Sequence, residues 1–256
     1  MNSNWLIPKW PAPSSVRAVC TGRSGGRSAA PYDSLNLGSH VGDDPLTVGA
    51  NRALLHRALD AKPVFLSQVH GSAVVTLAPK TAQGTEADAS LTRQHGLACT
   101  IMVADCLPVL LTDESGSFVA AAHAGWRGLA GTRGRGVLES LLQEIEASSS
   151  AFSPSLLLAW LGPCIGPKAF EVGPEVRQAF LQHDPQAAAC FKPGVQGKWL
   201  ADLAGLARQR LRALGVRQVF GNDGHASWCT ASNPSQFFSH RRDHVSGRMA
   251  ACIWLG

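Results

Sequence analysis

The sequence predicts an α+β fold: a single layered domain of mixed β-sheets flanked by helices. Short apolar runs of five to eight residues recur between glycine, proline and aspartate residues, as buried strands do. Candidate helices are fewer, and several predicted strands follow one another directly, which favours α+β over strict strand–helix alternation. The 256 residues, 45% hydrophobic and 16% charged, are enough to bury a sizeable core.

The predicted strands are runs rich in branched apolar residues, several of them expected to be covered on both faces. In chain order they span 63–69, 97–103, 108–112, 117–124, 155–161, 216–220 and 248–255. No internal repeat or linker divides the chain. We therefore predict one domain over residues 1–256, beginning with an irregular segment at 1–15.

Helices are predicted from apolar residues at three- and four-residue steps. The segment 199–214 carries such a stripe, and Gly215 is placed to end it. Further helices are expected at 46–60, 136–147 and 174–183, the last with Pro174 in its first turn. The serine-rich stretch 147–155 is predicted to be a surface loop.

Charge and cysteine content indicate the compartment and the partners. The net charge of +5 is spread over scattered arginines without a basic run, so neither a nucleic-acid nor a membrane partner is expected. Seven cysteines without CxxC spacing, and no signal peptide or membrane-length apolar stretch, predict a cytoplasmic protein with reduced thiols. We expect a monomer.

Three segments place metal-binding side chains at strand ends. His70 follows a strand in SQVHG, Cys106 breaks two strands in VADCLPVLL, and His123 ends a strand in AAAHAGWRG. Strand ends at one edge of a sheet lie close together, so these side chains can converge. Two imidazoles and a thiolate suit Zn²⁺ and leave a fourth position for water or substrate. The spacing alone leaves open that the three residues are unrelated.

A cysteine nucleophile is the alternative chemistry for the same residues. Cys106 with His123 as base, oriented by Asp105 or Asp88, would make a hydrolase, and His70 would then have no role. Cys164 and Cys229 are expected to be structural thiols.

The order of the motifs resembles the YfiH-type family, which is variously described as purine nucleoside phosphorylase, laccase-domain polyphenol oxidase and peptidoglycan editing factor. The motifs are SLNLGSHVGDDP, SQVHG, EADASLT, VADCLPVLL, AAAHAGWRGLA, LGPCIGPKAFEVG and the C-terminal FFSHRRD. The resemblance implies a layered fold of the YfiH-like, cytotoxic-necrotizing-factor-like kind. It also implies the metal ligands His70, Cys106 and His123.

The resemblance further implies a zinc enzyme that splits adenosine, inosine and methylthioadenosine with phosphate and deaminates adenosine. Phosphate binding calls for arginine forks. Arg127, close to a metal ligand, is the first candidate for substrate binding and catalysis. Arg241 and Arg242 are next by resemblance, followed by Arg52, and Asn36 is a candidate for binding ribose or base.

Deamination needs a carboxyl group that shuttles protons, as in zinc deaminases. Asp88 in EADAS is the first candidate, followed by Asp105 and Glu86, although Asp105 could instead orient a ligand.

Copper oxidation of phenols is the second enzymatic hypothesis. Two histidines and one cysteine are also the blue-copper set, usually with an axial methionine, and Met102 lies four residues before Cys106. None of the nine histidines forms a His-x-His pair of the kind that multicopper laccases use for their cluster, so this hypothesis ranks below the zinc enzyme. An editing hydrolase for cell-wall precursors and a non-enzymatic metal or ligand sensor remain as further alternatives.

Overall fold

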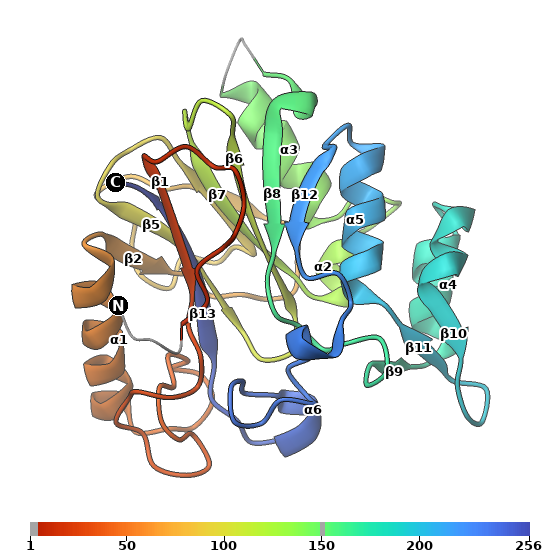
Figure 1. Ribbon diagram of the computed structural model, residues 1–256, viewed down its shortest axis with the longest axis horizontal. Coiled ribbons are helices and arrows are strands. Elements are labelled where there is room, and N and C mark those ends of the chain that lie inside the picture. The colour runs from red at the N-terminus through yellow and green to blue at the C-terminus, as the bar shows by residue number, and fades with distance from the viewer. Residues whose placement is uncertain (1–4, 149–151) are drawn as a thin grey trace.

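Two β-sheets packed face to face form the centre of the computed structural model, which describes residues 5–148 and 152–256 (Figure 1). The first sheet has the order β1-β13-β5-β2, with β1 (Val16–Cys20), β13 (Met249–Leu255), β5 (Leu97–Val103) and β2 (Lys62–Phe65). The second has the order β12-β8-β6-β7-β4-β3, with β12 (Gln218–Gly221), β8 (Leu157–Leu161), β6 (Leu107–Asp113), β7 (Val119–Ala124), β4 (Ala89–Thr92) and β3 (Val74–Thr76).

Strand alternation builds the layers. In β5, Cys99, Ile101 and Val103 face the second sheet, while Ala98 and Met102 face the opposite side. Strand β13 alternates in the same way, so one sheet contributes to two separate cores.

Helices cover both outer faces (Figure 1). Helix α1 (Pro45–Leu59) packs on the first sheet, and α3 (Val137–Ala147) and α5 (Leu203–Ala213) pack on the second. A small sheet of β9 (Glu171–Val172), β11 (Trp199–Ala201) and β10 (Phe191–Pro193) lies to one side with α4 (Pro174–Leu181). The short elements are α2 (Trp126–Ala130), α6 (His240–Asp243), η1 (Pro154–Leu156), η2 (Pro185–Cys190) and η3 (Ala226–Trp228).

The predicted α+β class is confirmed, and a strand occupies each of the seven predicted strand regions. The predicted helix at 199–214 is wrong at its start, because 199–201 is strand β11 and the helix begins at Leu203. Asp202 caps that helix by accepting a hydrogen bond from the N–H of Gly205. Strands β1, β3 and β4 and the small sheet were not predicted. Residues 149–151 of the predicted loop lie outside the described residues, and the single-domain organisation stays a prediction.

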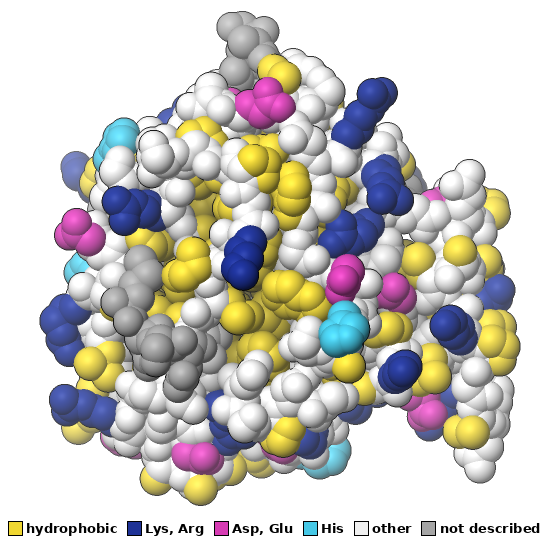
Figure 2. All heavy atoms as spheres, in the orientation of Figure 1, with side chains coloured by type: hydrophobic (Ala, Val, Ile, Leu, Met, Phe, Trp, Pro, Cys, Tyr) yellow, Lys and Arg dark blue, Asp and Glu magenta, His cyan; other side chains and the backbone are white. Residues whose placement is uncertain are grey.

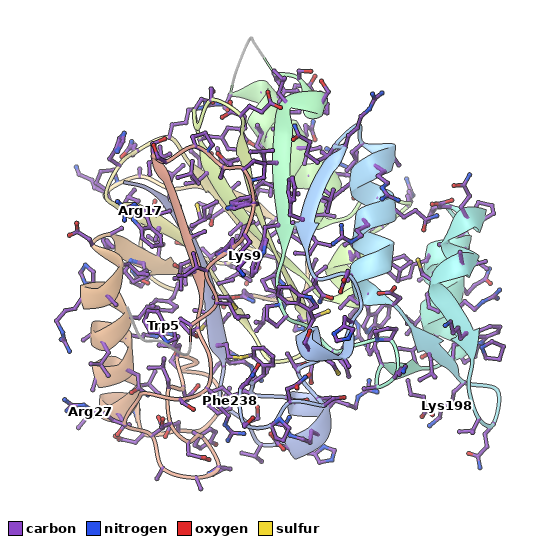
Figure 3. The ribbon with its side chains drawn as sticks, in the orientation of Figure 1. Trp5, Lys9, Arg17, Arg27, Lys198 and Phe238 are labelled. Carbon is purple, nitrogen blue, oxygen red and sulfur yellow. The ribbon has the colours of Figure 1, made fainter. Side chains whose placement is uncertain are left out.

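Hydrophobic side chains gather on one face of the molecule, over the region of β1 and β8 (Figure 2). The Lys9 side chain lies across this face (Figure 3). The described part of the chain contains no helix long and apolar enough to cross a bilayer. All seven cysteines are free thiols.

Candidate metal centre

Two connections and one strand bring His70, Cys106 and His123 together. His70 lies in the loop after β2, Cys106 in the turn between β5 and β6, and His123 within β7. Their ligand atoms all lie within 4.8 Å of one another, and Cys106 Sγ is 3.6 Å from His70 Nε2. Zinc–nitrogen and zinc–sulfur bond lengths place the donors of a tetrahedral site about 3.4–3.6 Å apart. The three side chains therefore fit one metal ion.

The strand register explains why Cys106 and His123 meet. Strands β6 and β7 pair antiparallel with Pro108 opposite His123, so the turn before β6 lies beside the end of β7. Two residues of the connections have positive φ angles, 61° at His70 and 91° at Asp105. Such backbone is uncommon outside glycine and often marks a functional site.

Gly125 leaves room for the ligands. A Cβ atom at this position would lie 2.9 Å from His70 Cδ2 and 3.0 Å from Cys106 Sγ. Any side chain at residue 125 would therefore push two of the three ligands. The glycine that directly follows β7 therefore leaves the space in which His70 and Cys106 lie.

Asp88 forms hydrogen bonds with two of the metal ligands. It is fully buried, and its Oδ1 accepts hydrogen bonds from His123 Nδ1 (2.8 Å) and the backbone N–H of His70 (2.9 Å). Its Oδ2 accepts from the N–H groups of Val69 and Gly71. The bond to Nδ1 leaves His123 Nε2 to face the cluster, as carboxylate–histidine pairs do behind metal sites.

The electrostatics favour an ionised thiol. Burial alone would raise the pKa of Cys106, but the imidazoles of His123 and His70 lower it to about 6. Burial would lower the pKa of His123, but Cys106 and Asp88 raise it to about 9. For Asp88, burial opposes ionisation, yet hydrogen bonds from His123 and the backbone lower its pKa overall. The thiolate, the form of cysteine that binds metals, is thus favoured.

The metal centre lies in the wall of a cavity of about 430 Å³. This volume is within the range of small-molecule sites. A larger cleft of about 820 Å³ lies beside α5 and η2, but it contains none of the three ligands.

Part of the cavity lining is polar and carries a positive charge. Arg248, His40, Gln68 and Met102 belong to it. The pKa of Arg248 is lowered by burial, and that of His40 is lowered by burial and by the charges of Arg248 and Arg52. We call Arg248 and His40 the Arg–His pair.

Another part of the lining is aromatic and apolar. Trp126, Phe170 and Ile165 belong to it. Arg127 lies over the Trp126 ring at 4.4 Å, and Arg241 lies over Phe170 at 5.5 Å. We call Trp126 and Phe170 the aromatic pair.

The structure brings most predicted site residues to the cavity. Arg127, Arg241 and Asp105 line it with the metal ligands. The Asp105 carboxylate accepts hydrogen bonds from the hydroxyl of Thr230 and the N–H of Arg241.

Five candidates are not in the wall of the cavity, one of them Asp88, which lies behind the metal ligands. Asn36 is fully buried, with its amide bonded to Gly38 and Asp43 and to the Arg248 backbone. Arg242 donates to backbone carbonyls, Arg52 donates to the Leu37 carbonyl, and Glu86 is exposed. Sequence reasoning considered Arg248 among the arginines that could bind phosphate, but it did not assign His40, Trp126 or Phe170 to the site, although the SLNLGSHVGDDP, AAAHAGWRGLA and LGPCIGPKAFEVG motifs contain them.

The comparisons with known proteins agree with one another over nearly the whole chain. Residues 17–256 match the family model described as multi-copper polyphenol oxidoreductase laccase. A purine nucleoside phosphorylase of Pseudomonas aeruginosa is 50% identical, covering 98% of both chains, and the purine nucleoside phosphorylase YfiH of Escherichia coli is 49% identical, covering 99% of both. The crystal structure of a Neisseria meningitidis protein matches with a TM-score of 0.89 and 44% identity, covering 99% of both chains.

Proposed function

Because the chain belongs to the family described as multi-copper polyphenol oxidoreductase laccase, and relatives at half identity are named purine nucleoside phosphorylases, we propose that it is a metal-dependent purine nucleoside phosphorylase. Adenosine, inosine and methylthioadenosine are the proposed substrates, and deamination of adenosine is a second activity at the same site. The observation that carries the proposal is the cluster of His70, Cys106 and His123 in the wall of a cavity that aromatic and cationic side chains also line.

Zinc is the proposed metal, held by His70, Cys106 and His123. When bound, it would act as a Lewis acid that polarises an oxygen of the substrate. Asp88 fixes the His123 tautomer and the His70 backbone, so the ligands are oriented before the ion arrives. The four hydrogen bonds at Asp88 occupy both of its oxygens, which favours this orienting role over proton transfer.

The aromatic pair provides a place for the purine base. Trp126 and Phe170 offer ring faces on which a base can stack, and a base–aromatic stack contributes about 1–3 kcal/mol. The Arg127 side chain makes no hydrogen bond with any described residue, and its guanidinium lies over the Trp126 ring. It is therefore free to move onto a bound base or ribose.

Asp105 is the carboxylate that remains in the cavity wall for proton transfer. Glu86 is exposed and does not line the cavity, and both oxygens of the buried Asp88 already accept hydrogen bonds. Asp105 is held by Thr230 and the Arg241 backbone, so its position is fixed next to Cys106. We assign it the role of proton shuttle in deamination.

A product assay tests the function. Protein with one equivalent of zinc is incubated with adenosine, inosine or methylthioadenosine, with and without phosphate, and products are separated by chromatography. Free base and ribose 1-phosphate formed only with phosphate support the proposal. Loss of zinc and activity together in Cys106→Ser supports a ligand role, and loss of activity with zinc retained supports a nucleophile.

Copper-dependent phenol oxidation is the second candidate function. The family description favours it, and Met102 lines the same cavity as the two histidines and the cysteine. Oxidation of a phenol that requires added copper, with no phosphate-dependent product from any nucleoside, would replace the phosphorylase proposal.

A further inference from the structure

Arg248 presents uncommitted donors to the cavity. It is half-buried just before β13, and its Nη1 donates to the carbonyls of Ser246 (2.8 Å) and Gly247 (3.1 Å). No acceptor among the described residues bonds to its Nε or Nη2, and no described carboxylate forms an ion pair with it. A guanidinium held in this way has two nitrogens, Nε and Nη2, with three N–H donors left for an anion.

The fold fixes this arginine against the loop that carries His40. Asn36 Oδ1 accepts hydrogen bonds from the N–H groups of Gly38 and Arg248, each 2.9 Å long. A Cβ at Gly38 would lie 2.7 Å from Arg248 Cγ, so only glycine lets the loop pass over the arginine stem. His40, two residues after Gly38, lines the cavity together with Arg248.

Arg248 carries the positive charge of the pair and has no ion-pair partner among the described carboxylates. Burial lowers the Arg248 pKa overall, although Cys106 and Asp105 lie near enough for their charges to raise it. Burial and the charge of Arg248 lower the pKa of His40, so its neutral imidazole can serve as a hydrogen-bond donor. A half-buried guanidinium without a carboxylate partner is typical of an anion site.

We propose that Arg248 and His40 form the phosphate subsite of this enzyme, in the cavity that the metal ligands, Trp126 and Phe170 also line. The inference rests on the proposed phosphorylase function.

A phosphate held in the same cavity as the nucleoside can take part in the bond changes of the proposed reaction. A phosphate oxygen forms a bond to ribose C1′ while the bond from C1′ to the base nitrogen breaks. The electron pair leaves with the base, and the phosphate proton ends on the released base. The products are base and ribose 1-phosphate, with no other reactant consumed.

The test compares phosphate and nucleoside dependence in single variants. Arg248→Gln should raise the KM for phosphate about 10–100-fold, the usual loss for a hydrogen-bonded charged partner. The KM for the nucleoside should change much less. His40→Ala, at an exposed side chain, should raise the phosphate KM about 3–10-fold. Arg217→Gln, at an exposed residue outside the cavity, is the charge-matched control and should leave both constants unchanged.

A direct binding measurement separates this inference from the proposed function. Inorganic phosphate is titrated into zinc-loaded protein and chelator-treated protein and followed by ³¹P line broadening. Binding that is lost in Arg248→Gln but kept in Arg217→Gln supports the subsite, even if no nucleoside is split. Phosphorolysis with a phosphate KM within twofold of the parent in both Arg248→Gln and His40→Ala overturns the subsite and leaves the function standing. If Arg248→Gln does not fold, His40→Ala decides.

Discussion

Replacing Asp88 with asparagine should weaken metal binding without removing any metal ligand. The carboxylate accepts four hydrogen bonds, two at each oxygen, from His123 Nδ1 and the N–H groups of Val69, His70 and Gly71. An amide keeps one acceptor oxygen and turns a donor toward the other pair. Two buried donors then lose their acceptor, at a cost of about 1–3 kcal/mol each.

The substitution should lower the zinc affinity by changing the tautomer of His123. If the amide NH₂ faces His123, the imidazole must move its proton to Nε2, the atom that faces the cluster. Loss of such an orienting partner lowers metal affinity about 10–100-fold. We therefore expect Asp88→Asn to lose about 2–6 kcal/mol of unfolding free energy and one to two decades of zinc affinity. Denaturant titration and competition with a zinc-binding dye measure the two effects.

The pH dependence of stability adds a second readout. The folded pKa of Asp88 is lowered, so its ionisation stabilises the fold above its ordinary pKa of about 4 and this stability is lost as pH falls through the folded pKa. In Asp88→Asn, which has no carboxyl group at this position, the unfolding free energy should no longer show this loss as pH falls. Asp113→Asn is the matched control, since Asp113 also accepts several hydrogen bonds and has a lowered pKa but lies away from the metal centre. An Asp88→Asn protein with parental zinc affinity and no turnover would refute the orienting role and restore Asp88 as the proton shuttle.

Three further predictions follow from the same geometry. Gly125→Ala should lower zinc affinity at least tenfold because its Cβ meets His70 and Cys106, whereas Gly49→Ala, with open space around its Cβ, should bind zinc normally; dye competition checks both. In chelator-treated protein, iodoacetamide should alkylate Cys106 first, with a rate that falls as pH drops through about 6, and zinc should protect it; peptide mass spectrometry would contradict this if another cysteine reacted first. Trp126→Ala should raise the nucleoside KM about 5–100-fold with a smaller change in the phosphate KM; equal effects on both would place the base elsewhere.

The long buried strands could be predicted because their side chains repeat a simple pattern. Segments such as 97–103 are apolar throughout, since β5 is covered on both faces. Strand β4 (ASLT) has one large apolar residue, and only its place between β3 and β7 makes it a strand. The helix over 199–214 was misplaced at its start because the leucine spacing continues across the capping residue Asp202.

The site was predictable where it lies next to a strand end. His70, Cys106 and His123 each follow or end a recognisable strand, so their convergence could be expected. The approach of Arg248 to His40 could not, because it depends on one amide, Asn36, that bonds a backbone group 212 residues away. Asn36 was considered as a substrate ligand because its side chain is polar, but its burial leaves it no free donor or acceptor in the cavity.

The family description as a multi-copper oxidoreductase can be weighed against this chain's own ligands. Reduction of oxygen to water takes four electrons, which a multicopper cluster built on His-x-His pairs can supply. The nine histidines include no such pair, and His70, Cys106 and His123 form the one cluster of three or more candidate ligands found in residues 5–148 and 152–256. Three donors fit one ion, and one copper ion exchanges one electron at a time. The ligand set therefore favours Lewis-acid chemistry on a bound substrate over four-electron oxidation, which is why the phosphorylase proposal ranks first.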